Sequence, residues 1–146
     1  MTFENINVDI DCDCLEGAIC DTESHFGRKT NKNFLKPGDF ISYWEKGKRS
    51  EDQICAEICS LKGISLNFMN DESKENVINI FKQLFPISPS YKPHIHVIQL
   101  GGTCGYVKHT PDHVNGNLYH YDFYKSDEFN LEDVTHVEVI SLAEYV

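Results

Sequence analysis

The amino-acid sequence predicts an α+β fold in which two main helices pack on a mostly antiparallel or mixed sheet of four to six strands. Three observations predict it: an amphipathic pattern over about 50–62, a second over about 71–85, and a run of short alternating segments after Pro93. The 146 residues have the usual length of one domain, and 40% of them are hydrophobic. We therefore expect a single domain, with an N-terminal part at 1–49 and an α+β core at 50–146.

The N-terminal part opens with a strictly alternating segment at 6–14. Its apolar and cysteine positions share one face and its asparagine and aspartates share the other, a period of two that predicts a half-buried strand. Residues 15–39 show little periodicity and predict irregular structure, which ends in the turn signal Pro37-Gly38. The apolar group at 40–44 fits either a strand or one helical turn.

A capping box predicts the start of the first helix. Ser50 is followed three residues later by Gln53, and Gly63 stands where a C-terminal cap glycine is expected. Cys55 and Cys59 lie four residues apart on the apolar stripe of this helix. We therefore interpret both cysteines as core residues.

The second helix and the strands around it follow from pattern and proline. An alternating segment at 64–68 predicts a strand directly before this helix. The helix begins at the Asn70-Asp71 cap and ends at Pro86, because proline cannot continue a helix. The predicted later strands are 94–100, 118–124 and 134–142, with 106–109 as a further candidate.

Charge and cysteine content restrict the class of protein. The formal net charge of −10 opposes general binding to nucleic acid or to an anionic membrane, because phosphate neutralisation needs clustered basic residues. One basic segment, 28–49, also carries Tyr43 and Trp44, so it is either a surface that stacks on a nucleotide or a solvated rim. No secretory signal or apolar run of membrane length is visible. We therefore expect a cytoplasmic protein whose six cysteines are reduced thiols or metal ligands.

Five of the seven histidines lie in the block 94–122. His94 and His96 are two apart on one predicted strand and share a face, as do His120 and Asp122 on the next strand. Imidazoles that share a strand face are typical ligands of zinc or another transition metal. The candidate ligands are therefore His94, His96 and His120, and the alternative is that these histidines are half-exposed strand residues.

Cys104 offers a second chemistry in the same block. A thiolate beside a base that is held by a carboxylate is an activated nucleophile, and Cys104, His120 and Asp122 supply these three groups. The alternative is that Cys104, which glycines flank, is a small residue at a turn between strands.

A further metal site is predicted near the N-terminus. Its four ligands, with the spacing of a compact zinc knuckle, are Cys12, Cys14, Cys20 and His25. The alternative places the first two cysteines on the inner face of the first strand, as small apolar residues.

Size, charge and the lack of a known catalytic motif favour a binding module. The sequence contains no P-loop, no dinucleotide fingerprint, no nucleophile elbow and no H-E-x-x-H zinc motif. An acidic protein of this length suits an immunity protein or another accessory component of a defence system, which meets a basic protein partner through complementary charge. The oligomeric state is open.

The order of the elements suggests an enzyme instead. The strand segment Gly63-Ile64-Ser65-Leu66 comes before the helix at 71–85, and Glu138 lies on a later strand. This layout resembles that of the ADP-ribosyltransferases. The resemblance implies an arginine or histidine on an early strand, for which Arg28 and His25 are the candidates, and Glu138 as the catalytic acid.

Overall fold

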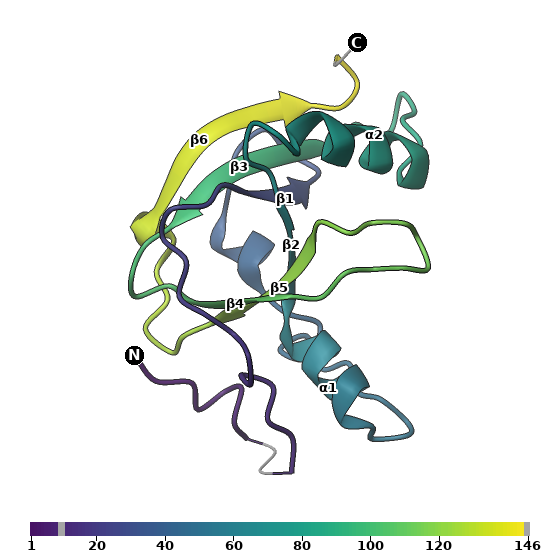
Figure 1. The fold of residues 1–146 in the computed structure, drawn as a ribbon. Helices are drawn as coiled ribbons and strands as arrows, with labels where there is room; N and C mark the ends of the chain where they lie inside the picture. Colours follow the sequence, from purple (N-terminus) through teal and green to yellow (C-terminus); the bar gives the residue numbers. More distant parts are fainter. Residues whose placement is uncertain (9–10, 145–146) are drawn as a thin grey trace.

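The structure, a computed structural model, describes residues 1–8 and 11–144. Its centre is a six-stranded sheet in the order β4-β5-β2-β1-β3-β6, and every neighbouring pair is antiparallel (Figure 1). The strands are β1 (Phe26–Thr30), β2 (Ile64–Phe68), β3 (His94–Leu100), β4 (Gly105–His109), β5 (His120–Lys125) and β6 (Val134–Ser141). The helices are α1 (Cys55–Lys62) and α2 (Lys74–Leu84), with short 3-10 helices at Pro37–Phe40 and Leu131–Asp133. The predicted α+β class is confirmed.

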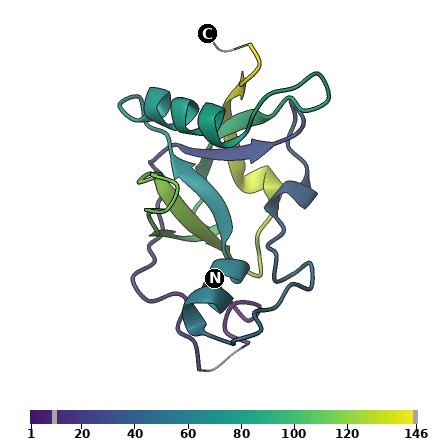
Figure 2. The same cartoon turned by 90° about the vertical axis from the view of Figure 1, so that its right-hand side faces the viewer.

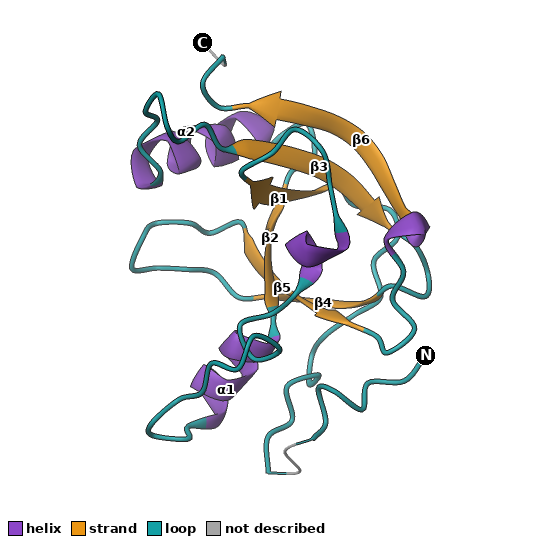
Figure 3. Ribbon diagram, turned by 180° about the vertical axis from the view of Figure 1, so that it is seen from behind, coloured by secondary structure: helices purple, strands orange, loops and turns teal. Residues whose placement is uncertain are grey.

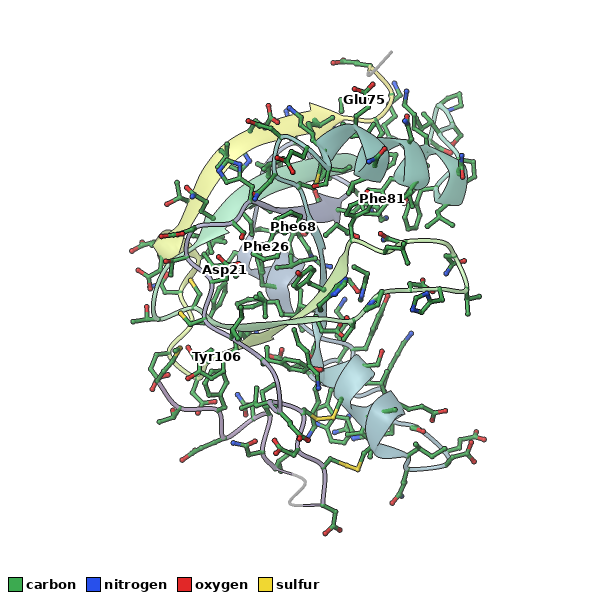
Figure 4. All side chains as sticks on the ribbon, in the orientation of Figure 1. Asp21, Phe26, Phe68, Glu75, Phe81 and Tyr106 are labelled. Atoms are coloured by element: carbon green, nitrogen blue, oxygen red, sulfur yellow. A yellow bond between two sulfur atoms is a disulfide. The ribbon has the colours of Figure 1, made fainter. Side chains whose placement is uncertain are left out.

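Apolar side chains are buried on both faces of the sheet. One face is largely aromatic, and Figure 4 shows Phe26 and Phe68 near its centre, where their rings meet edge to face at 6.2 Å. The opposite face of β3 and β6 is covered by α2, which lies across that half of the sheet (Figure 2). Val77, Ile78 and Phe81 of α2 are buried there because their spacing places them on one side of the helix.

The sheet opens between its two central strands. β1 pairs with β3 along its whole length, but it pairs with β2 only at Phe26–Phe68 and Gly27–Asn67 in the described structure. Beyond Gly27 the two strands therefore diverge and leave room for side chains between them. Figure 3 shows the two halves of the sheet, with α2 beside one half and α1 at the far end of the other.

The N-terminal segment differs from its prediction. The predicted strand at 6–14 is wrong, because its described residues form turns and irregular chain; residues 9 and 10 lie outside the described part. Two disulfides, Cys12–Cys55 and Cys14–Cys59, join this segment to α1, as the yellow bonds in Figure 4 show. The expectation of reduced thiols is therefore wrong for these four cysteines.

The predicted boundaries hold better in the second half of the chain than in the first. The prediction of irregular structure over 15–39 is wrong at β1, because Phe26–Thr30 form a strand. The predicted start of the first helix is also wrong, because Gln53 has a φ of +50° and the helix begins at Cys55. The Ser50 hydroxyl instead hydrogen-bonds the Glu57 carboxylate. Neither α1 nor α2 is long and apolar enough to cross a membrane.

Candidate functional site

A cleft lies where the sheet opens. It has a volume of about 550 Å³, and its walls are β1, β2, the C-terminal ends of both helices and the loop between β4 and β5. Figure 1 shows this loop projecting between α1 and α2. Arg28, Ser65 and His120 reach the cleft from the three adjacent strands β1, β2 and β5. Three polar groups of different chemistry thus converge in one concavity.

Arg28 spans the gap between the diverging strands. Its Nη1 donates to the main-chain oxygen of Ser65 at 3.0 Å, and its Nε donates to the main-chain oxygen of Asp39 at 2.8 Å. Burial lowers the pKa of the guanidinium, and the nearby Asp39 and Tyr43 oppose this shift. Because an arginine keeps its proton in proteins, Arg28 is a fixed cation in the wall of the cleft.

Ser65 and His120 form a hydrogen-bonded pair. The Oγ atom of the exposed Ser65 lies 3.1 Å from Nε2 of His120. The other ring nitrogen, Nδ1, lies 2.9 Å from the main-chain oxygen of Thr110. A carbonyl oxygen only accepts, so Nδ1 carries the hydrogen and Nε2 is left to accept one from Ser65. The contact with Thr110 therefore fixes His120 as a base that faces the cleft.

Asp122 lies beside this pair and is almost fully buried. In the β2–β5 register it stands directly opposite Ser65, so the two side chains share a face of the sheet. Asp122 is only 6% exposed, and burial raises the pKa of its carboxyl, while His120 and Lys108 act in the opposite direction. A Cβ atom at Gly63 would come within 2.7 Å of the carboxyl oxygen. Glycine at that position thus makes room for a carboxyl group held against the site.

The rim of the cleft is basic and aromatic. Lys29 and Lys46 line it together with Tyr43, a ring that is 52% exposed. Lys29 is held in place: its Nζ donates to the Tyr91 hydroxyl at 2.7 Å and lies 4.2 Å from the ring centre of Phe85. This combination suits an anionic ligand with a planar group.

A second cavity of about 480 Å³ adjoins the first. The two share Ser60, Ser65 and His120 in their walls, while Asp122 and Lys108 belong to the second cavity. The Ser65–His120 pair therefore stands at the junction of two spaces, each large enough for part of a substrate.

The predicted histidine ligands are not brought together. His94 and His96 lie on β3, and β1 and β2 separate that strand from His120 on β5. His96 is fully buried, with Nε2 2.8 Å from the main-chain oxygen of Lys32 and Nδ1 3.1 Å from Nε2 of His136. With both disulfides formed, the described residues contain no group of three or more His, Cys, Asp or Glu side chains arranged to hold a metal ion.

Cys104 lies away from the other two members of the predicted triad. The next residue in the chain, Gly105, pairs with Lys125. Asp122 pairs with Lys108, about 10 Å further along β4 at the usual rise of a strand. The thiol is buried against the main-chain oxygen of Asp133, and burial raises its pKa. The structure thus places His120 beside Asp122 but leaves Cys104 in the core.

The predicted zinc knuckle is not assembled either. Cys12 and Cys14 are bonded to the cysteines of α1. Cys20 is exposed, with its Sγ 3.8 Å from the main-chain oxygen of Gly102, and His25 donates its main-chain N–H to Asn70.

Arg28, Ser65 and Glu138, which the transferase resemblance names, lie on three different strands. Arg28 lies on β1 and Ser65 lies on β2, directly before α2. Glu138 lies instead on the edge strand β6, where it is ion-paired with Lys74 of α2. The carboxylate that faces Ser65 is Asp122. The sequence alone does not reveal that Asp122 lies opposite Ser65, because β2 and β5 are far apart in the chain and meet only as paired strands of the sheet.

Comparisons with known proteins add no family to these observations. No protein-family model, no curated protein and no solved structure matches the chain.

Proposed function

We propose that the chain is an ADP-ribosyltransferase-like enzyme that binds NAD⁺ in the cleft and transfers its ADP-ribose group. The observation that carries the proposal is the hydrogen bond between Arg28 and the main chain of Ser65 at the mouth of the cleft. The resemblance requires an arginine on an early strand and a strand that carries a serine. This hydrogen bond joins the two, β1 and β2, at the point where the sheet opens. Asp122 takes the role of the acid that the sequence assigned to Glu138.

The lining of the cleft suits this substrate. NAD⁺ carries two phosphates and two planar rings, so its site needs fixed cations and apolar or aromatic surface. Arg28, Lys29 and Lys46 supply the positive charge on a protein whose net charge is −10. Tyr43 and Phe85, which also line the cleft, supply ring surface.

Each polar group has a place in the transfer. The bond between the nicotinamide nitrogen and ribose C1′ breaks, and its electron pair leaves with nicotinamide. The positive charge that develops on C1′ is stabilised by the carboxylate of Asp122. An acceptor hydroxyl or amine in the second cavity bonds to C1′, and its proton passes to Nε2 of His120. Ser65 holds the substrate ribose, and in this structure its hydroxyl donates to the same ring nitrogen.

The test is a titration of the purified protein with NAD⁺ by calorimetry, followed by an assay for nicotinamide release. We expect Arg28→Ala to weaken NAD⁺ binding by about 10-fold to 100-fold, because it removes a charge-assisted contact. Arg49→Ala is the matched control, since Arg49 stacks on Trp44 at 3.6 Å outside the cleft. Equal affinity of both variants, or no binding by the wild type, would reject the proposal.

Asp122→Asn and Glu138→Gln separate the two candidate acids. We expect Asp122→Asn to abolish nicotinamide release while NAD⁺ still binds, because the carboxylate acts on the charge that develops during bond breaking. Glu138→Gln keeps full activity if the acid is Asp122, since Glu138 lies on β6. The reverse result would return the role to Glu138.

The binding-module interpretation stays a prediction, as does a cytoplasmic location. An acidic module needs a complementary surface on a basic partner rather than a cleft. Capture of a specific basic protein by the wild type and equally by Arg28→Ala, with no NAD⁺ binding, would favour that interpretation.

A further inference from the structure

We propose that Cys12, Cys14, Cys55 and Cys59, once reduced, form a tetrathiolate site for Zn²⁺ that replaces the two disulfides. The proposal is independent of the function of the cleft. It rests on the way the fold places two cysteine pairs, far apart in the sequence, against each other.

The backbone positions of the four cysteines suit a metal site. The Cα atoms are 5.3 Å apart for Cys12 and Cys55 and 5.2 Å apart for Cys14 and Cys59. Cys55 and Cys59 are one turn apart on α1 and share its face, and the disulfides hold Cys12 and Cys14 against that face. Four sulfurs at about 2.3 Å from a tetrahedral zinc are about 3.8 Å from one another.

The pattern of the four residues has the form of a structural zinc site. C-x-C in the N-terminal segment and C-x₃-C on α1 give two short chelating pairs, and four ligands leave no open position on the metal. The sequence interpretation combined the first pair with Cys20 and His25, but the structure puts the second pair in their place.

The surroundings of the four sulfurs suit a closed, negatively charged centre. Cys14 is fully buried and packs with Ile58 and Phe3 in one apolar cluster, which keeps water from that end of the site, whereas Cys55 lies at the surface. Zinc with four thiolates carries two negative charges. The buried Lys62 lies on the last turn of the same helix, and its Nζ donates to the main-chain oxygen of Ile6 in the segment that carries the first cysteine pair. This ammonium group offsets part of that charge.

The exchange of disulfides for zinc balances. A cellular dithiol gives two electrons and two protons to each disulfide and becomes a disulfide itself, so two dithiols yield the four thiols. Zn²⁺ then binds, and the thiols lose their four protons as they become thiolate ligands. Both states clamp the N-terminal segment to α1, one by covalent bonds in an oxidising compartment and one by metal in a reducing compartment.

The test uses the full chain, reduced with a phosphine under anaerobic conditions and titrated with Co²⁺. We expect one Co²⁺ per chain, with the thiolate-to-cobalt charge-transfer absorption and the visible bands of tetrahedral cobalt, and displacement by one Zn²⁺. Cys55→Ser/Cys59→Ser loses both signals. The matched control Cys20→Ser/His25→Ala retains both, because neither residue is a ligand in this proposal.

A second measurement needs no variant. The reduced wild type is treated with an alkylating reagent with and without Zn²⁺, and the modified cysteines are mapped by mass spectrometry. Zinc should slow the modification of the four proposed ligands, while the exposed Cys20 reacts equally in both samples. Reduced protein that shows no cobalt spectrum, or zinc that protects Cys12 and Cys14 but not Cys55 and Cys59, would overturn the proposal.

Discussion

The two helices are held to the sheet in different ways. α2 packs on β3 and β6 through Val77, Ile78 and Phe81, all buried and all on one face of an eleven-residue helix. α1 has eight residues and no clear apolar face, and Ile58 is its buried hydrophobic residue. Two disulfides bind this helix to the N-terminal segment. Burial of apolar surface thus attaches α2 to the molecule, and cross-links attach α1.

This contrast follows the position of the cleft. Ser60 and Leu61 of α1 line the cleft, as do Phe81 and Leu84 at the end of α2. Both helices give side chains to the cleft, but α1 has eight residues and α2 has eleven, so α1 has fewer side chains left to bury and needs another means of attachment. The cross-linked half of the molecule is also the half that holds His120 and Asp122.

Substitution of Ile78 by alanine should give the largest effect. The side chain is fully buried under α2, and its loss should lower the free energy of unfolding by about 2–5 kcal/mol, because it leaves a cavity as well as removing apolar burial. Ile58→Ala on α1 is the matched variant and should cost less, since Ile58 retains 8% exposure in a looser setting. Urea unfolding of both oxidised variants measures the difference. Equal losses would mean that α1 is packed as well as α2.

Removal of one disulfide should give the second-largest effect. Cys14→Ala/Cys59→Ala opens a cross-link with a sequence separation of 45 residues, which should cost about 2–4 kcal/mol through the gain in chain entropy of the unfolded state. Cys20→Ala, at an exposed free thiol, should change the stability by less than about 0.5 kcal/mol. Urea unfolding without reductant and without metal is the measurement. A loss no larger than that of the control would show that α1 does not depend on the cross-link.

The elements of the fold also differ in how well the sequence predicts them. β2, β3 and α2 have strong periodic patterns, so their predicted and observed ranges nearly coincide. The segment around β1 carries Gly27, Arg28 and Lys29, which are poor signals for a central strand. β1 becomes a strand because β3 pairs with its whole length, and that is a tertiary effect.

The sequence also predicts only part of the candidate site. His120 and Asp122 are recognisable from the sequence because two residues on one strand share a face. Their nearness to Ser65 depends on the pairing of β5 with β2, strands separated by 55 residues along the chain between Ser65 and His120. The cysteine pairs pose the same difficulty, since several pairings of six cysteines fit the sequence equally well.

His96 should make the packed half of the molecule sensitive to acid. Burial, together with the neighbouring His136 and His94, lowers the pKa of His96, although the hydrogen bond to Lys32 opposes this shift. The neutral ring is therefore the form that stabilises the fold: its contribution is complete above the unfolded pKa of about 6.5 and is lost as the pH falls through the folded value. The free energy of unfolding should fall as the pH drops below about 6.5, by at most about 1.4 kcal/mol per pH unit for this one proton.

The control for His96 is a pair of variants measured over the same pH range. His96→Gln should remove this part of the slope, because glutamine does not titrate. His113→Gln, at an exposed position in the loop between β4 and β5, should leave the slope as it is in the wild type. An unchanged slope in His96→Gln would assign the acid sensitivity to other groups.

Asp122→Asn should give the smallest effect and the opposite sign. Burial raises the pKa of this carboxyl, so its contribution to stability is complete below the unfolded pKa of about 3.8 and is lost as the pH rises through the folded value. Because burial disfavours the charged form of this group, asparagine, which carries no charge, should raise the midpoint of thermal unfolding slightly at neutral pH. Asp112→Asn is the contrasting control, because hydrogen bonds from Asn115 lower the pKa of Asp112 and make its carboxylate favourable. A residue that weakens the fold while facing a cleft is typical of a functional site, since selection retains it for its chemistry. A lower midpoint in Asp122→Asn would instead make this carboxylate a structural group of the cross-linked half.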